Sequence, residues 1–227
     1  MISYLQKLIQ EGEHQRQDFK YCINDSKKIA RSLVAFANTD GGSLLIGVKD
    51  NGHIVGIQSE EEYYMAEAAA RIYSKPPIPF TTREWKAEGK TVLQIIVAPS
   101  TEKPHFAKDD SGKWLAYIRH NDENRLANKV LIEVWRKEKS RQGVLVHFSD
   151  DEKFLLDYLE QNPTISLSAF ARKACIPYRK AEQLLSDFIV LGILKPVFAD
   201  DYILYQLNED FDRESWEHRP AGQQPVP

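Results

Sequence analysis

Hydrophobic residues recur at helical spacing in four stretches of the first 140 residues. The stretches cover residues 2–9, a segment that follows Ser26, residues 60–73 and residues 126–137. In the second stretch Ile29, Leu33 and Phe36 fall on one face of a helix. Such a stripe predicts an amphipathic helix that packs its apolar face on another layer.

Short β-rich runs supply a sheet for these helices to cover. They lie at residues 43–48, 53–57, 78–85, 91–97 and 114–119. Between the first two runs, Asn51-Gly52 favours the positive φ angles of a tight hairpin turn. The pattern predicts an α+β domain with a mixed sheet and flanking helices over residues 1–145.

A second domain begins with a helix-start signal. Ser149 followed by Glu152 has the spacing of a capping box, and two further helices are predicted from about Ser166 and from Pro177. Gly192 ends the last helix. Two runs at 193–198 and 202–207, joined by an Asp200-Asp201 turn, predict a β-hairpin. This order predicts a winged helix-turn-helix over residues 146–208, and residues 209–227 are expected to be a disordered tail.

Composition excludes several classes of protein. The 227 residues are 42% hydrophobic and 11% aromatic, enough for a substantial core. No apolar stretch approaches the roughly 18 residues needed to cross a bilayer, and the first residues lack the pattern of a secretion signal. The two cysteines lie far apart in sequence. We therefore expect a cytoplasmic protein without a disulfide framework or membrane association.

Net charge gives little support for general polyanion binding. The chain carries 30 Lys and Arg against 33 Asp and Glu, and the acidic excess lies after residue 148. Any basic surface is therefore local and lies mainly in the first two-thirds of the chain.

Three blocks in the first domain carry the most specific pattern. They are Glu13 with Asp18-Phe19-Lys20, then Ala35-Phe36-Ala37-Asn38-Thr39-Asp40-Gly41-Gly42, then Ile46-Gly47-Val48-Lys49-Asp50-Asn51-Gly52 followed by Ile54-Val55-Gly56-Ile57. In order and spacing they closely resemble the Alba-like (AlbA_2-type) domain of the Schlafen family. Tyr117-Ile118-Arg119 is similar to a later element of that family. The resemblance implies an Alba-like nucleic-acid-binding domain, and it gives no guidance beyond residue 148.

The resemblance also implies a candidate metal site. Nuclease members of the family bind a divalent metal with three acids, and Glu13, Asp18 and Asp50 occupy the matching places, Asp18 replacing the usual glutamate. Mg²⁺ or Mn²⁺ would suit these oxygen ligands and could activate water for phosphodiester cleavage. Lys20, two residues after Asp18 and so on the same face of a strand, could contact the phosphate.

Local geometry alone does not decide whether these three acids form a site. Five residues separate Glu13 from Asp18, which places them on different faces of a helix or a strand, so a bend between them is required. The alternative interpretation is that Glu13 caps a helix, Asp50 belongs to its turn and Lys20 is solvated. A phosphate-binding glycine motif is absent, so nucleotide hydrolysis is not predicted and no cofactor is expected for binding alone.

The third helix of the second domain is the predicted recognition helix. Its first turns carry Tyr178, Arg179, Lys180 and Gln183, a mixture of cations and hydrogen-bonding groups suited to a major groove. The acidic charge of this domain and the Asp200-Asp201 wing tip oppose DNA contact. Winged helices also bind proteins, and that interpretation stays open.

A second polyanion surface is predicted in the first domain. It comprises Lys27, Lys28 and Arg31 on one helix, together with Arg119, Arg125 and Lys129, although a solvated helix face also accounts for the first three.

The sequence as a whole predicts a nucleic-acid-binding protein, in the first instance a homodimeric, DNA-binding transcriptional regulator without enzymatic activity. The alternatives are a divalent-metal-dependent endoribonuclease or endonuclease that uses Glu13, Asp18 and Asp50, and a protein-interaction adaptor.

Overall fold

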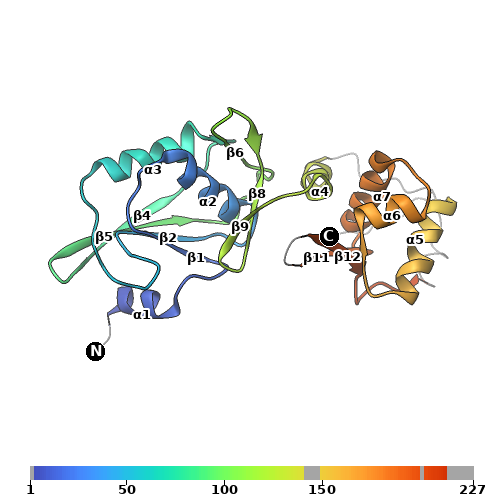
Figure 1. Ribbon diagram of the computed structural model, residues 1–227, viewed down its shortest axis with the longest axis horizontal. Coiled ribbons are helices and arrows are strands. Elements are labelled where there is room, and N and C mark those ends of the chain that lie inside the picture. The colour runs from blue at the N-terminus through green and yellow to red at the C-terminus, as the bar shows by residue number, and fades with distance from the viewer. Residues whose placement is uncertain (1–2, 141–148, 200–201, 214–227) are drawn as a thin grey trace. The chain divides into compact units, whose positions relative to one another are not determined.

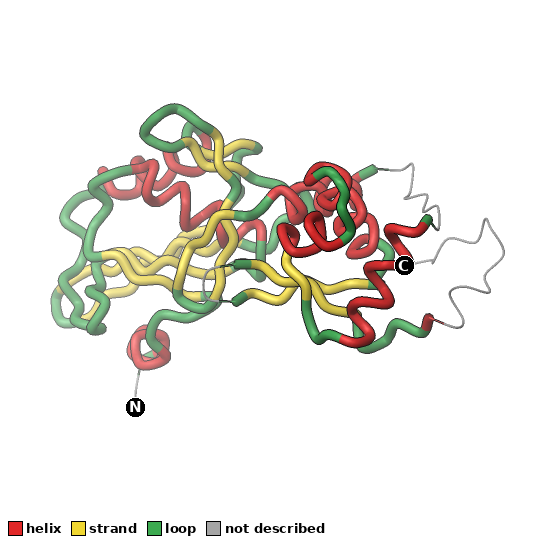
Figure 2. The backbone as a smooth tube through the Cα atoms, turned by 45° about the vertical axis from the view of Figure 1, so that its right-hand side comes forward, coloured by secondary structure: helices red, strands yellow, loops and turns green. Residues whose placement is uncertain are grey.

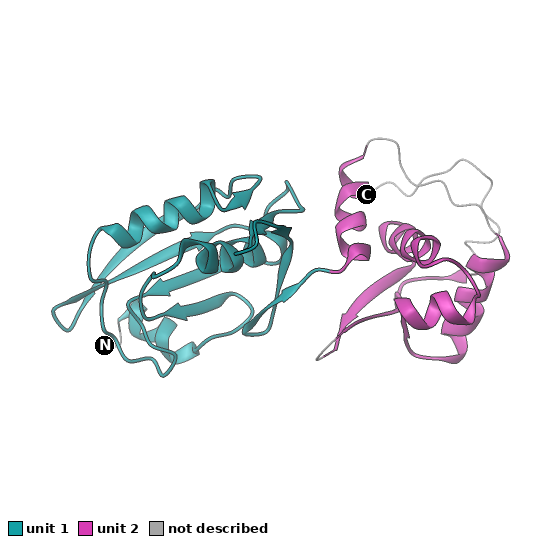
Figure 3. Cartoon of the chain, turned by 45° about the horizontal axis from the view of Figure 1, so that its top comes forward, with its two compact units in different colours: residues 1–127 teal, residues 128–227 magenta. Residues whose placement is uncertain are grey.

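The computed structural model describes residues 3–140, 149–199 and 202–213, and it divides into two compact units, Met1–Ala127 and Asn128–Pro227 (Figure 3). The boundary expected near residue 145 falls at 141–148, outside the described residues. The observed division comes earlier because helix α4 (Lys129–Lys139), which the sequence analysis assigned to the first domain, packs on α7 (Tyr178–Val190) of the second unit.

A four-stranded mixed sheet forms the centre of unit 1. Its strand order is β1 (Gln17–Lys20), β2 (Gly42–Ile46), β5 (Lys90–Val97) and β4 (Thr81–Ala87). The pair β1 and β2 is parallel, with Asp18 opposite Leu44, and the other two pairs are antiparallel. Helix α2 (Ser26–Asn38) connects the parallel pair, as a parallel connection requires.

Helices cover both faces of this sheet. On one face α2 and α3 (Glu61–Arg71) pack over alternate residues of β2 and β5, including Leu44 and Ile46. On the other face, α1 (Tyr4–Glu11) buries Leu5 against Phe19 and Leu45. Figures 1 and 2 show α1 on the side of the sheet opposite α2 and α3. The period of two in a strand sends Leu44 and Leu45 to opposite cores.

Two small β structures close the end of unit 1 beside α2. One has the order β3 (Ser74–Lys75), β6 (Phe106–Lys108) and β7 (Trp114–Leu115), and the other is a hairpin of β8 (Tyr117–His120) and β9 (Glu123–Leu126). The buried Asn38 amide donates to the carbonyls of His105 and Tyr117, at 2.9 Å each. This side chain ties the end of α2 to both structures.

Two strand expectations need correction. The run at 114–119 is two strands, separated at Ala116. The run at 53–57 forms no strand; Ile54 makes an isolated bridge with Val48, and the Asn51-Gly52 turn is closed by Gly52 N–H donating to the Lys49 carbonyl at 2.7 Å. At this site a turn formed where predicted, with a positive φ at Gly52 but not at Asn51, and its flanking residues form a single bridge.

Unit 2 contains the three helices and the hairpin expected from the sequence, with α4 and the short strand β10 added. They are α5 (Asp150–Gln161), β10 (Ile165–Ser166), α6 (Leu167–Lys173), α7, β11 (Leu194–Phe198) and β12 (Ile203–Leu207), and the sheet order is β10-β12-β11. The capping box of Ser149 and Glu152 is present, and Gly192 adopts φ +70° after α7. The core is built on Phe170, Leu185 and Phe188. The Asp200-Asp201 turn and most of the expected tail lie outside the described residues.

In the part of the chain that the structure describes, no helix has the length and apolarity needed to span a membrane.

Candidate functional site

A tight turn between α1 and β1 supplies the bend that the acidic pair needs. The N–H groups of His14 and Gln17 each donate to the other residue's carbonyl, at 3.0 and 3.1 Å. The chain reverses between them, so Glu13 lies beside β1, and its Oε1 accepts the Phe19 backbone N–H at 2.8 Å. Glu13 and Asp18, five residues apart, therefore meet at the start of β1.

Asp18 is the buried centre of a small polar cluster. Its Oδ1 accepts from Lys20 Nζ at 2.9 Å, and its Oδ2 accepts from Ser32 Oγ at 3.2 Å. The Arg119 guanidinium lies 3.7 Å from the same Oδ1. Lys20 and Asp18 share a strand face, as their spacing predicts. Two cations and a hydroxyl thus compensate a carboxylate that is almost without solvent contact.

Glu13 holds its proton more tightly than an ordinary carboxyl. The pKa of Glu13 is raised to about 7, mainly by burial and then by a hydrogen bond with Asp18 and the charge of Asp18, whereas the Phe19 N–H and the Lys20 charge act in the opposite direction. Two adjacent carboxyl groups resist double ionisation. Glu13 can therefore take up or release a proton near neutral pH.

Asp50 is exposed in the turn that ends with Gly52. Among residues 3–140, 149–199 and 202–213, no three His, Cys, Asp or Glu side chains gather into a group that could hold a metal ion. The structure thus pairs Glu13 with Asp18 and does not add Asp50. The oxygens of Asp18 are taken by Lys20, Ser32 and Arg119, so this donor set does not fit a divalent cation.

The Arg119 side chain is buried, so Arg119 does not belong to the polyanion surface expected from the sequence. Its side chain is only 1% exposed. It donates from Nη2 to the Gln17 carbonyl at 3.0 Å and from Nη1 to Asn124 Oδ1 at 3.1 Å, and it stacks over the Phe36 ring at 5.4 Å. Arg119 joins the β8 hairpin to β1 and cannot reach a phosphate from there. The sequence offered no signal for this burial, because the partners come from distant segments.

Of the remaining cations, Arg125 on β9 pairs with Glu123 at 2.9 Å and Lys129 belongs to unit 2. The other three lie on the first two turns of α2. Lys27 Nζ is 3.2 Å from Asp110 and Arg31 is 3.7 Å from the same carboxylate, whereas Lys28 is exposed. Asp110 offsets much of the positive charge here. This surface is therefore weaker than the sequence suggests.

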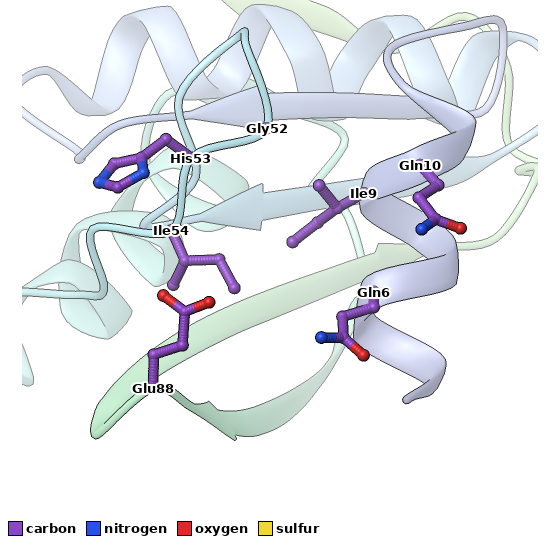
Figure 4. Close-up of a pocket in the computed structure, with 7 residues that line it drawn as sticks. All are labelled: Gln6, Ile9, Gln10, Gly52, His53, Ile54 and Glu88. Carbon is purple, nitrogen blue, oxygen red and sulfur yellow. The ribbon is translucent and has the colours of Figure 1, made fainter. Parts of the chain in front are cut away.

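A cavity of about 300 Å³ opens under α1 in unit 1 (Figure 4). The labelled residues come from α1, from the turn after Val48 and from the β4–β5 hairpin; they are Gln6, Ile9, Gln10, Gly52, His53, Ile54 and Glu88. None of the candidate site residues lines it.

In unit 2 the four predicted recognition residues lie together on the first two turns of α7. Tyr178, Arg179, Lys180 and Gln183 are all exposed. Lys180 forms an ion pair with Asp151 of α5, whereas Arg179 makes no ion pair with any described residue. The structure brings these four side chains onto one end of a helix.

Farther along α7, helix α4 covers the side that the core leaves open (Figure 1). Lys137 Nζ donates to Ser186 Oγ at 2.6 Å and to Asp187 Oδ1 at 2.8 Å. Ser186 is completely buried. The sequence predicted α4 as an amphipathic helix but not this contact, because a stripe of apolar residues does not specify the surface it will meet.

Comparisons with known proteins concern mainly unit 1. The family model described as Schlafen, AlbA_2 matches residues 13–128. Among solved structures, the DIP2311 protein from Corynebacterium diphtheriae is 21% identical, with a TM-score of 0.41; the match covers 58% of this chain and only 28% of that one. The N-terminal domain of a RecG-related protein from Nitrosomonas europaea is 20% identical, with a TM-score of 0.37 and coverages of 65% and 97%. No curated protein matches the chain.

The family match spans more than half of the sequence and contains the Glu13 to Lys20 block, the Ala35 to Gly42 block and Arg119. The chain therefore belongs to the Schlafen AlbA_2 family.

Proposed function

We propose that this protein binds double-stranded DNA through the N-terminal end of α7 and acts as a transcriptional regulator. The observation that carries the proposal is the joint exposure of Tyr178, Arg179, Lys180 and Gln183 on the first two turns of that helix. Membership in the Schlafen AlbA_2 family relates the chain to nucleic acids in general, and the choice of DNA rests on unit 2.

We infer that unit 2 is a winged helix-turn-helix. Helices α6 and α7 are separated by a short turn, and the β11–β12 hairpin follows them. The first short strand, β10, pairs with β12 at the far side of the hairpin from β11. In proteins of this class the second helix of the pair contacts the major groove. The corresponding helix here is α7.

The side chains at this end suit duplex DNA better than duplex RNA. An arginine can bond two acceptors on guanine, and Gln183 can pair with the edge of adenine. The major groove of A-form RNA is too deep and narrow for such side chains. Arg179 is the principal cation because Asp151 already neutralises Lys180.

Fluorescence anisotropy with labelled duplex DNA, single-stranded DNA and duplex RNA tests the proposal. The full chain should prefer duplex DNA, and Arg179→Ala should weaken that binding by roughly tenfold, the usual effect of losing one good arginine contact. Arg71→Ala is the matched control, because Arg71 is an exposed arginine on α3 in unit 1 and should leave affinity unchanged. Equal binding by wild type and Arg179→Ala would refute the assignment of α7.

The homodimer belongs to this proposal. Two copies related by a two-fold axis would present two α7 ends to a palindromic site. Sedimentation with and without a palindromic duplex should show two protein chains per duplex; one chain per duplex would refute the dimer.

A second candidate function, cleavage of nucleic acid, is favoured by one observation, the raised pKa of Glu13 beside Asp18. Incubating labelled RNA and DNA without added metal, and with Mg²⁺ or Mn²⁺, tests it. Cleavage by wild type that is lost in Glu13→Gln but kept in Asp50→Ala would establish a nuclease that uses the Glu13–Asp18 pair, because the structure does not group Asp50 with that pair. Intact substrate in every sample would reject it.

A further inference from the structure

Strand β4 forms an outer edge of the central sheet of unit 1. It is 7 residues long, and among the described residues its only strand partner is β5. Figure 1 shows the hairpin of these two strands projecting from the sheet. An edge strand presents a row of unpaired backbone N–H and C=O groups, which can pair with a strand of another chain. The residues of β4 therefore decide what this edge can bind.

Two other edge strands of the structure are protected against such pairing. On β1, the Gln17 carbonyl accepts from Arg119 Nη2 at 3.0 Å, so the β8–β9 hairpin guards that edge. In unit 2, the edge strand β11 contains Pro196, which has no N–H to donate. Strand β4 has no proline, and its residues pair one to one with those of β5, without a bulge. Its edge lacks both of these devices.

The backbone groups that face the open edge belong to alternate residues of β4. Lys86 lies opposite Thr91 of β5, and the Thr91 carbonyl accepts the Ile57 N–H at 2.7 Å, on the side away from β4. Lys86 and Thr91 are therefore a pair without mutual hydrogen bonds, and the N–H and C=O of Lys86 point to the open edge. Because this orientation alternates along a strand, the backbone groups of Glu84 point the same way.

The charges on β4 are complementary to those of a second copy. When two β4 strands pair antiparallel about a two-fold axis through Trp85, Glu84 of each copy lies opposite Lys86 of the other. Opposite charges directly across an antiparallel pair stabilise it, and like charges destabilise it. A two-fold register centred on Arg83, Glu84 or Lys86 would place that charged residue opposite its own copy. The register centred on Trp85 is therefore favoured.

The other face of β4 offers aromatic contacts in the same register. Trp85 lies opposite Val92 and packs against the core beneath α1. Tyr4 of α1 is 54% exposed and stacks on Trp85 with ring centroids 5.3 Å apart. In the register centred on Trp85, the two Trp85 side chains lie directly opposite each other, an arrangement that favours strand pairing. Ion pairs on one face and aromatic rings on the other thus support the same alignment.

We propose that two copies of this chain join along β4, in the register centred on Trp85, to form one sheet that continues through both copies. This inference rests on the homodimer in the proposed function and names the surface that forms it. The contact does not require DNA, because all of the groups that form it belong to unit 1.

Sedimentation of the full chain without DNA, over a range of micromolar concentrations, tests this interface. Wild type should self-associate to a dimer. Glu84→Lys makes positions 84 and 86 both positive, and Lys86→Glu makes them both negative. Each variant should therefore weaken self-association by roughly tenfold or more, since both cross-strand pairs become repulsive.

Two further samples test the register itself. An equimolar mixture of Glu84→Lys and Lys86→Glu should form a mixed dimer, because each position then meets the opposite charge. The double variant with both substitutions should dimerise like wild type. Asp122→Lys is the control for a change of charge alone: Asp122 is exposed in the β8–β9 turn, whose Asn121 N–H donates to Gln15 beside β1, at the other side of the sheet. Thermal unfolding verifies that each variant is folded.

The outcomes separate this interface from the proposed function. A wild-type chain that stays monomeric, a dimer that Glu84→Lys leaves intact, or a mixture of the two variants that does not associate would overturn the β4 interface. DNA binding that depends on Arg179 would survive each of these results. Conversely, if Arg179→Ala binds DNA like wild type while the mixed dimer forms, the proposed function fails and the interface stands.

Discussion

Replacing Glu13 with glutamine should make unit 1 more stable at alkaline pH and leave it nearly unchanged in acid. The Glu13 carboxyl lies beside Asp18 and accepts the Phe19 N–H. Glutamine keeps a carbonyl for that N–H, and its amide can donate to Asp18 as the protonated acid does. The substitution therefore imitates protonated Glu13 and removes only its ionisation.

The magnitude follows from the pKa. A rise from 4.5 to about 7 corresponds to an upper bound of about 3 kcal/mol, at 1.36 kcal/mol per unit. Because Glu13 is only half-buried, solvent screening reduces this to about 1 kcal/mol. Between pH 4.5 and 7 the folded state binds more protons than the unfolded state at this group, so the wild-type chain loses stability as pH rises through that window. The variant lacks this loss.

Thermal unfolding of wild type and Glu13→Gln at pH 4.5 and pH 8 measures the effect. At pH 8 the variant should unfold about 2–4 °C higher, and at pH 4.5 the two should coincide. Glu11→Gln is the matched control, since Glu11 is 59% exposed two residues away and should show no such difference. A variant that is equally or less stable at pH 8 would refute the reasoning about this pair.

Two further predictions concern unit 1. Arg119→Met should destabilise the fold by about 3–5 kcal/mol, because it removes the guanidinium that lies beside the buried Asp18 carboxylate. Adding Asp18→Asn should restore part of the lost stability, and urea unfolding of the single and double variants measures both effects. Gly47→Ala should also destabilise, by more than about 1 kcal/mol, because Gly47 has φ +92° and an added Cβ would lie 2.6 Å from the Gly56 carbonyl carbon. An unchanged unfolding midpoint for Gly47→Ala would show that this contact between turns relaxes freely.

Features that depend on neighbouring residues in the sequence were predicted well. The Ser149–Glu152 capping box, the start of α7 after Pro177 and the turn at Asn51-Gly52 all formed where expected. Each rests on hydrogen bonds or dihedral angles within a few residues. Strand periodicity also placed Lys20 and Asp18 on one face of β1, but the ion pair that they form there was not predicted.

Features that depend on distant segments were not predicted. Arg119 is buried because β8 lies against α2 and its side chain reaches the carbonyl of Gln17, about a hundred residues earlier. The placement of α4 on α7 likewise depends on tertiary packing, through Lys137 and Asp187. The family resemblance grouped Asp50 with Glu13 and Asp18 as metal ligands. In the structure Asp50 is exposed in its turn, and among the described residues it belongs to no group that could hold a metal ion.

Site-directed crosslinking from a native cysteine tests the central claim most directly. Cys175 is exposed in the turn before α7, and Cys22 lies in unit 1. A thiol-reactive photocrosslinker on Cys175, in a Cys22→Ser chain, should capture duplex DNA, and adding Arg179→Ala should reduce the yield by roughly the factor by which it weakens binding. The same reagent on Cys22, in a Cys175→Ser chain, should capture much less. Equal or greater capture from Cys22 would place the DNA on unit 1 and contradict the assignment of α7.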